Sequence, residues 1–202
     1  NNDDGLILVY DLGGGTFDVT IVDVKISKKK VDVKTSQGDQ LLGGHDFTDK
    51  IIEIFNNAYK KKYKVDLVDK KNKLTYKRFF SIAEEAKKTL SKLDKTSVEL
   101  NGSKGPLNVE VTRKEFENSI STLLVRTELL IDGALKDLKI KENDIDDIIL
   151  VGGSTRINLV QDLIKKKFKK KSKIALNVDE AVSLGAAIYA GFMAPDKNLN
   201  KE

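Results

Sequence analysis

The most constraining feature of the sequence is a run of three glycines between two strand-like segments. Residues 6–10 are an apolar run, and residues 17–24 alternate well enough for a second strand. Gly13–Gly15 interrupt them after only a few residues. A connection this short joins antiparallel neighbours, so the chain is predicted to open as a hairpin with glycines at its turn.

The glycine loop has the composition of a phosphate-binding turn. Glycines can adopt a positive φ and let a ligand approach the backbone, and successive amides can form an anion-binding nest. No Walker pattern is present and no helix follows. The alternative is a flexible hairpin turn. We predict phosphate binding by Gly13, Gly14, Gly15 and Thr16, with flanking Asp11 and Asp18 facing a metal-bound phosphate directly or through waters.

The rest of the chain alternates strands and helices, which is typical of an α/β fold. Residues 31–35 continue the antiparallel meander. Thr112 and Glu115 match a capping box at the start of a long helix, in which Gly133 is a weak point. Further strands are predicted at 97–100, 107–111 and 147–151. Helices are predicted at 46–63, 75–93, 113–138 and 157–168, and from 177 or 179 to 190.

Composition excludes several functional classes. The 202 residues are 33% charged and 40% hydrophobic, which suits a soluble globular chain of one domain or two joined subdomains. Without cysteine there are no disulfides or thiolate metal sites, and with a single histidine a histidine-based triad or a multi-histidine zinc site is nearly excluded. The net charge of +5 comes mostly from lysine, which favours a solvated surface over nucleic-acid binding.

The termini and hydropathy add two expectations. No apolar run approaches the roughly 18 residues of a membrane span. The first residues lack the basic and apolar regions of a signal peptide, and they lack an initiating methionine. We therefore expect a piece of a longer protein that contacts neither membrane nor nucleic acid.

A second glycine turn, residues 151–157, follows the strand at 147–151. Ligands of open α/β sheets bind where strands end, and helix starts offer free amides. Arg156 could stack its guanidinium on an aromatic base. The alternative is a strand-to-helix turn that uses Gly152 and Gly153 only for geometry.

One face of the helix at 75–93 carries four polar residues at three- and four-residue spacing: Glu84, Lys87, Lys88 and Ser91. The first two could bond ribose hydroxyls and the last two could meet a base. The default alternative is a solvated amphipathic face. Asp179 is interpreted equally well as a helix cap or as a ligand contact, whereas His45 is interpreted as structural or exposed.

Several motifs occur together in a recognisable order. They are DLGGGTFDV at 11–19, LLGGHDF, AEEAKKTLS, VGGSTRI at 151–157, and NVDEAVSLGAA. Over residues 6–193 the chain resembles the second lobe of the ATPase domain of 70-kDa heat-shock protein chaperones, within the actin and sugar-kinase superfamily. The resemblance implies an α/β, actin-like (ribonuclease H-like) half-domain with a mixed sheet and flanking helices. Subdomain IIA would comprise 5–41 and 120–193, an inserted α+β subdomain IIB 42–119, and a frayed tail 194–202.

The resemblance also implies a role for each matching residue. The phosphates of ATP or ADP would be held by Gly13, Gly14, Gly15 and Thr16, with Gly44 nearby. Asp11 and Asp18 would lie near Mg²⁺ and K⁺, and with Thr16 would support catalysis that this chain alone does not complete. Ribose and adenine would contact Glu84, Lys87, Lys88, Ser91, Gly152, Gly153, Ser154, Arg156, Ile157 and Asp179.

The implied function is half of a chaperone's Mg-ATP site, which couples ATP hydrolysis to binding of unfolded polypeptides. The implied partners are the first lobe and peptide-binding domain of the parent protein, J-domain cochaperones at 18–37, and nucleotide-exchange factors at 42–119. The chain alone is expected to be inactive, because the groups positioning the attacking water belong to the first lobe. Alternatives are a cochaperone or exchange factor without productive hydrolysis, and a small-molecule kinase. The expected location is cytoplasmic, with an organellar lumen as the alternative.

The chain departs from the family pattern at four positions. His45 replaces the usual acid after the double glycine, and Lys88 stands where an arginine commonly stacks on adenine. Asn158 and Val178 replace prolines. An ammonium lacks a planar face, so Lys88 predicts weaker stacking on adenine. Together the four changes predict altered nucleotide affinity rather than an altered fold.

Overall fold

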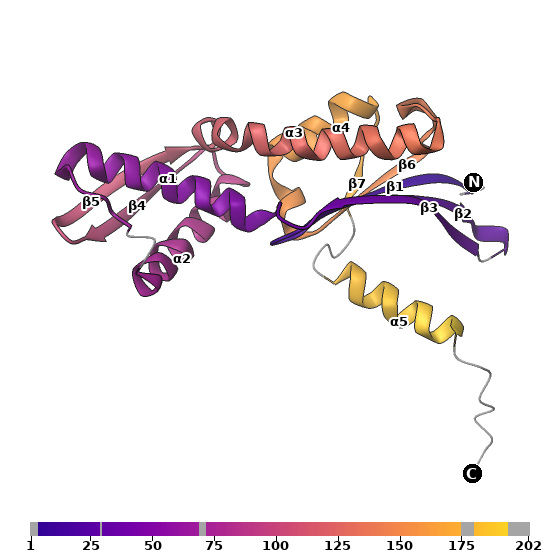
Figure 1. The fold of residues 1–202 in the computed structure, drawn as a ribbon, viewed down its shortest axis with the longest axis horizontal. Coiled ribbons are helices and arrows are strands. Elements are labelled where there is room, and N and C mark those ends of the chain that lie inside the picture. Colours follow the sequence, from indigo (N-terminus) through magenta and orange to yellow (C-terminus); the bar gives the residue numbers. More distant parts are fainter. Residues whose placement is uncertain (1–3, 29, 69–71, 175–179, 194–202) are drawn as a thin grey trace, which may run out of the picture.

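The computed structural model describes residues 4–28, 30–68, 72–174 and 180–193. Its main body is a five-stranded mixed sheet in the order β3-β2-β1-β6-β7 (Figure 1). The first three strands form the predicted antiparallel meander, whereas β6 pairs with β1 and β7 with β6 in parallel. The strand bounds are β1 Gly5–Leu12, β2 Phe17–Lys25, β3 Lys30–Asp39, β6 Asp147–Val151 and β7 Lys173–Ile174.

The parallel pairing of β1 with β6 determines where the two glycine turns lie. Its register runs from Ile7 opposite Asp147 to Asp11 opposite Val151. Both strands therefore end at the same edge of the sheet. The glycine loop follows β1 and the second glycine turn follows β6. Residues 141 positions apart in the sequence are therefore in direct contact, as in the 3.1 Å hydrogen bond from the Ser154 hydroxyl to the Gly13 carbonyl.

One face of the sheet is covered by α3 (Arg113–Leu138) and α4 (Asn158–Phe168) (Figure 1). Alternate residues of β1, Leu8, Tyr10 and Leu12, are fully buried, which is the period expected of a half-buried strand. The predicted helix start is confirmed, because the Thr112 hydroxyl accepts from the Glu115 amide at 3.2 Å.

Gly133, the residue predicted to be a weak point, lies within α3. The helix runs unbroken through this residue. A Cβ at Gly133 would lie 2.3 Å from the side-chain oxygen of Gln37 on β3. The glycine therefore allows the helix to approach the sheet closely instead of interrupting the helix.

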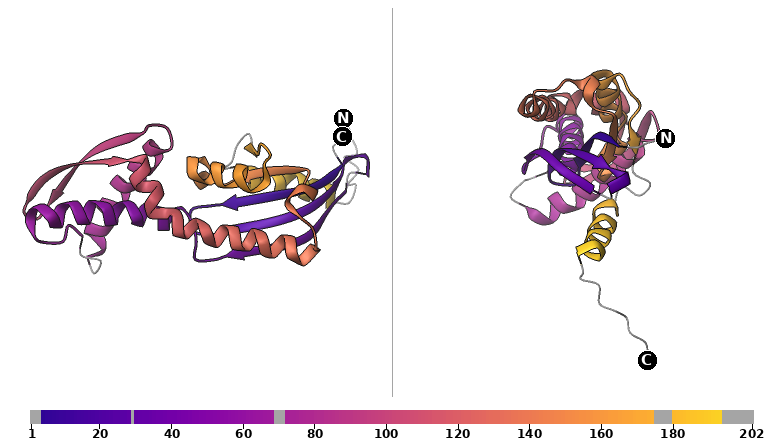
Figure 2. Two further views of the ribbon diagram at one scale, coloured as in Figure 1. Left: turned by 90° about the horizontal axis from the view of Figure 1, so that it is seen from above. Right: turned by 90° about the vertical axis from the view of Figure 1, so that its right-hand side faces the viewer.

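The segment between β3 and α3 forms the other end of the elongated molecule (Figure 2). It contains α1 (Gly44–Tyr63), α2 (Lys73–Leu90) and a hairpin of β4 (Lys95–Gly102) and β5 (Gly105–Thr112). The helices pack through buried aromatic and aliphatic residues, among them Phe47, Ile51, Phe55, Tyr59 and Phe79. The hairpin is the one expected, with longer strands.

The predicted end of α2 is wrong by three residues. The helix ends at Leu90, and the amides of Lys92 and Leu93 both bond the Thr89 carbonyl in a turn. Leu93 was expected in the apolar stripe, but it is 57% exposed because the turn takes it off the helix face.

Three short helices, η1 (Ile26–Lys28), η2 (Glu142–Asp144) and η3 (Gly153–Arg156), and the last helix, α5 (Ala181–Met193), complete the described structure. α5 lies on the side of the sheet away from α3 and α4 (Figure 1). Several of its apolar side chains are exposed: Val182, Leu184, Ile188 and Tyr189. Asn177, Asp179 and the tail at 194–202 lie outside the described residues. Among the described helices, none is long and apolar enough to cross a membrane.

Replacing Gly152 by alanine is expected to destabilise the fold. This residue has a φ of +85°, and a Cβ there would lie 2.4 Å from the Leu12 carbonyl oxygen. Strain in this backbone region and the clash together should cost about 2 kcal/mol or more. The measurement is the free energy of unfolding in urea.

The control is Gly15→Ala. No atom lies within 4 Å of a Cβ built there, so its cost should stay within about 0.5 kcal/mol. Equal losses in the two variants would contradict the steric explanation.

Candidate functional site

The two glycine turns and the start of α1 meet at one backbone carbonyl. The Gly13 carbonyl oxygen accepts a hydrogen bond from the Gly44 amide at 2.9 Å and one from the Ser154 hydroxyl at 3.1 Å. The Gly13 amide in turn donates to the Thr16 carbonyl at 3.0 Å. Hydrogen bonds to this one oxygen therefore join three segments that are far apart in the sequence.

The first turn of α1 holds the glycine loop. Amides at a helix start have no partner within the helix, and here the His45 amide donates to the Gly14 carbonyl at 2.7 Å. The Asp46 carboxylate accepts from the Gly43 amide at 2.8 Å. A Cβ at Gly43 would lie 2.5 Å from the backbone nitrogen of Gly15. Close backbone contact thus fixes the loop against α1.

The loop glycines themselves are not explained by backbone conformation. None of Gly13, Gly14 and Gly15 has a positive φ, so that expectation is wrong. A Cβ added to Gly13 would lie 3.6 Å from its nearest neighbouring atom, and a Cβ added to Gly14 would lie 3.7 Å from its own. A Cβ added to Gly15 would have no neighbouring atom within 4 Å. The described part of the chain leaves space beside the loop, which another group could occupy against the backbone.

A buried lysine joins α1 to α2 beneath the loop. Lys87 is 7% exposed, and its ammonium donates to the Gly44 carbonyl at 2.7 Å and to the Thr48 hydroxyl at 2.9 Å. It also pairs with the Glu84 carboxylate at 2.7 Å. Burial lowers the pKa of Lys87, although Glu84 opposes the shift. The three donors of this ammonium therefore have protein partners.

Glu84 stays ionised in this network. Burial alone would raise its pKa, but the hydrogen bonds from Lys87 and Thr48 outweigh burial and lower it. The Thr48 hydroxyl lies 2.5 Å from the Glu84 carboxylate. A carboxylate fixed in this way can accept hydrogen bonds from a ligand's hydroxyl groups.

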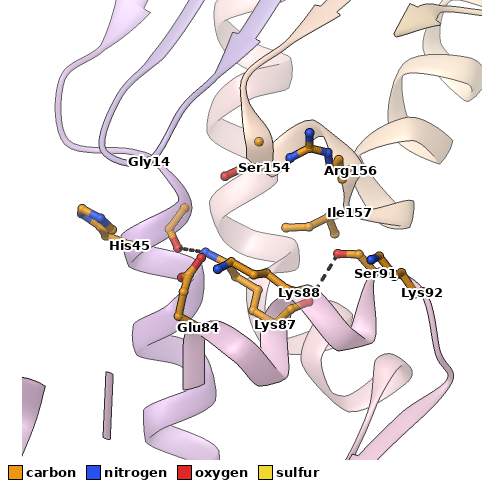
Figure 3. Close-up of a pocket in the computed structure, with 12 residues that line it drawn as sticks. Gly14, His45, Glu84, Lys87, Lys88, Ser91, Lys92, Ser154, Arg156 and Ile157 are labelled. Atoms are coloured by element: carbon orange, nitrogen blue, oxygen red, sulfur yellow. Dashed lines mark hydrogen bonds and ion pairs between the residues drawn. The ribbon is translucent and has the colours of Figure 1, made fainter. Parts of the chain in front are cut away.

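These elements surround a pocket of about 760 Å³, a volume in the range of small-molecule sites. In Figure 3, Gly14 and His45 lie at one end, and Arg156, Ile157, Ser91 and Lys92 lie at the other. Basic groups outnumber the single carboxylate, which suits an elongated anion. The predicted residues that line it are Gly14, Gly44, Glu84, Lys87, Lys88, Ser91, Gly153, Ser154, Arg156 and Ile157.

The remaining predicted residues lie beside the pocket or outside the described structure. Gly13, Gly15 and Thr16 belong to the same loop as Gly14, and Gly152 belongs to the second turn; none of them lines the pocket. Nothing is described for Asp179. At the rim, Lys88 pairs with Glu85 at 2.8 Å and is largely exposed.

Asp11 and Asp18 face each other as cross-strand partners on β1 and β2. Burial raises the pKa of Asp11, and the charge of Asp18 adds to the rise. Neither lines the pocket, and the described residues contain no group of three or more histidine, cysteine or carboxylate side chains that could hold a metal. Two carboxylates still fit Mg²⁺, which usually takes one or two carboxylates together with phosphates and waters.

Sequence reasoning missed two pocket residues, His45 and Lys92. For His45 the available signal was its place directly after the double glycine that packs on the loop. For Lys92 the available signal was its place four residues after Lys88, within the helix expected at 75–93. In the structure it follows the end of α2.

Comparison with known proteins adds relatives across the whole chain. A family model described as Hsp70 protein matches residues 1–201. Chaperone protein dnaK of Cyanidium caldarium is 41% identical over 194 residues, covering 93% of this chain and 31% of the relative. The mitochondrial heat shock 70 kDa protein of Pisum sativum is 39% identical over 203 residues, covering 97% of this chain and 29% of the relative. The stromal 70 kDa heat shock-related protein of the Pisum sativum chloroplast is 41% identical over 196 residues, covering 94% of this chain and 27% of the relative.

The mixed sheet, its flanking helices and the pocket between two glycine turns define an actin-like ATPase half-domain. The chain belongs to the Hsp70 protein family, whose members are chaperones and nucleotide-binding ATPases. It spans about 30% of the length of the curated relatives that it matches. These relatives include mitochondrial and chloroplast proteins, so the cytoplasmic location stays a prediction.

Replacing Lys87 by methionine is expected to destabilise the chain. The change leaves the Glu84 carboxylate and the Gly44 carbonyl without their ammonium partner in a largely buried place. A loss of about 2 kcal/mol or more in the free energy of unfolding should follow.

Lys88→Met is the matched control in urea unfolding. Lys88 makes the same i, i+3 type of ion pair one residue further along α2, but its side chain is 59% exposed. Its loss should not exceed about 0.5 kcal/mol. If both variants lose the same amount, the buried network does not hold α1 to α2.

Proposed function

We propose that this chain supplies half of the site at which a chaperone ATPase binds Mg-ATP or Mg-ADP. The observation that carries the proposal is the glycine loop at one end of a pocket in which basic side chains outnumber the one carboxylate. Hydrogen bonds to α1 and to Ser154 hold the loop. The described residues leave space beside the loop glycines, and phosphates of a nucleotide would fill that space.

The far end of the pocket suits an adenosine. The Arg156 guanidinium offers a planar cation for an aromatic base, and the neighbouring Ile157 side chain offers an apolar surface. Glu84 lies between the two ends (Figure 3), at the position where an acceptor can meet ribose hydroxyls. Lys87 would act by holding Glu84 and Gly44, since its donors already have partners.

Asp11 and Asp18 are the residues that would hold Mg²⁺, and K⁺ could share the same edge. The two carboxylates are cross-strand partners immediately before and after the loop. When bound, Mg²⁺ would neutralise charge on the phosphate oxygens. Asp11, Asp18 and Thr16 would support catalysis, but the other half of the nucleotide site, supplied by the first lobe, is needed to complete it.

The parent protein would couple ATP hydrolysis to unfolded-polypeptide binding. Its first lobe and peptide-binding domain would be partners of this chain, as would J-domain cochaperones on β2 and β3 and nucleotide-exchange factors on 42–119. The relatives are named as chaperone and heat shock proteins, which supports this assignment. We divide the chain accordingly into 5–41 with 120–193 and the insert 42–119. Neither a non-hydrolysing cochaperone nor a small-molecule kinase has support from the comparisons.

Calorimetric titration with Mg-ADP tests the site. The chain is expected to bind Mg-ADP, and Arg156→Ala should weaken binding by about fivefold or more, because the stacking cation is lost. Lys92→Ala is a matched control, since it removes one positive charge from the same end of the pocket without removing a planar group. Equal effects of the two substitutions would mean that charge alone, and not stacking, holds the base.

The chain alone is expected to hydrolyse ATP negligibly. Phosphoryl transfer needs electrostatic groups fixed on both sides of the phosphates, and only one side is supplied here. Release of phosphate from Mg-ATP by the chain is the measurement. A turnover rate near that of a two-lobe protein would overturn the half-site proposal.

A further inference from the structure

His45 is the only histidine of the chain, and it stands at the loop end of the pocket. Figure 3 shows it beside the loop that carries Gly14. Its ring nitrogen Nε2 lies 3.7 Å from the position of a Cβ on Gly14. The residue is exposed, so the ring can reach a group placed against the loop.

The position of His45 is fixed by its backbone and its ring. Its amide donates to the Gly14 carbonyl at 2.7 Å. Its ring packs edge-on against Phe80 of α2, with 5.4 Å between ring centroids and 75° between planes. The imidazole has no hydrogen bond or ion pair to another described residue. Its polar atoms are therefore available to a ligand.

The charged groups around His45 have other partners. On its own helix, Asp46 accepts from the Gly43 amide and Asp49 accepts from the Tyr76 hydroxyl of α2. On α2, Glu84 pairs with Lys87, and Lys88 pairs with Glu85. Arg156 lies across the pocket (Figure 3), and the loop residues Gly13–Thr16 carry no titratable side chain.

We propose that His45 is a specificity-determining residue whose protonated imidazole contacts the terminal phosphate of a nucleoside diphosphate held at the glycine loop. This inference rests on the proposed function. An imidazole, unlike an ammonium or a guanidinium, ordinarily changes its charge near neutrality. His45 therefore makes phosphate binding depend on pH.

The direction of the effect follows from charge. A phosphate within a few ångströms favours the imidazolium over the neutral ring. Protonation then strengthens binding by the same factor by which binding favours protonation. The affinity for the diphosphate rises as the pH falls through neutrality, and the affinity for adenosine, which carries no phosphate, does not change.

Because the chain has a single histidine, protonation of the His45 imidazole can be followed directly. Its Cε1–Hε1 signal in a ¹H–¹³C NMR spectrum needs no assignment, and it is followed against pH for the free chain, with Mg-ADP and with adenosine. Mg-ADP should move the midpoint of the titration upward by about 0.5 pH unit or more, equal to about a threefold affinity change. Adenosine should leave the midpoint unmoved.

His45→Gln provides a second readout, because glutamine can donate a hydrogen bond but carries no charge. The ratio of Mg-ADP affinity at about pH 6 to that at about pH 8 should be about threefold larger for the unsubstituted chain than for the variant. Titration of ADP's own phosphates is common to both proteins and cancels.

The outcomes separate this inference from the proposed function. If Mg-ADP perturbs other signals while the His45 midpoint stays in place, the inference is wrong and the nucleotide site stands. If Mg-ADP perturbs no signal of the chain, the proposed function fails, and the inference fails with it. An equal shift with adenosine would also overturn the phosphate contact.

Discussion

The carbonyl oxygen of Gly13 is the point on which the pocket depends. It accepts from the Gly44 amide at the start of α1 and from the Ser154 hydroxyl of the second turn. The sheet places it there, because β1 and β6 are parallel and end together. Without this shared acceptor, the loop and the two helix starts would lack a common anchor. The ends of parallel strands are where ligands of such sheets bind.

The buried network at Lys87 shows how a charged residue can be used for structure inside a binding site. A buried ammonium is costly unless its donors are satisfied, and Gly44, Thr48 and Glu84 satisfy them. The network ties α2 to the first turn of α1, which itself holds the glycine loop. Lys87 therefore helps to fix the shape of the pocket, whereas more exposed neighbours such as Lys88 contribute positive charge at its opening.

Much of the fold was predictable from local pattern. The meander, the hairpin at 97–111 and the strand at 147–151 are confirmed, since period-two alternation and glycine turns are local signals. The local pattern missed two features. It did not show that Gly133 lies against Gln37 of β3, or that a local turn at Thr89 takes Leu93 off the helix. No window along the chain shows which partner a residue will meet.

The two glycine turns, the polar face of α2 and the family of the chain could be predicted from the sequence, because these depend on residue types and their spacing. The place of His45 beside Gly14, the burial of Lys87 and the absence of a positive φ in the loop glycines became known only from the structure. These facts depend on parallel strand pairing and helix packing between segments far apart in the sequence. Spacing alone does not encode such contacts.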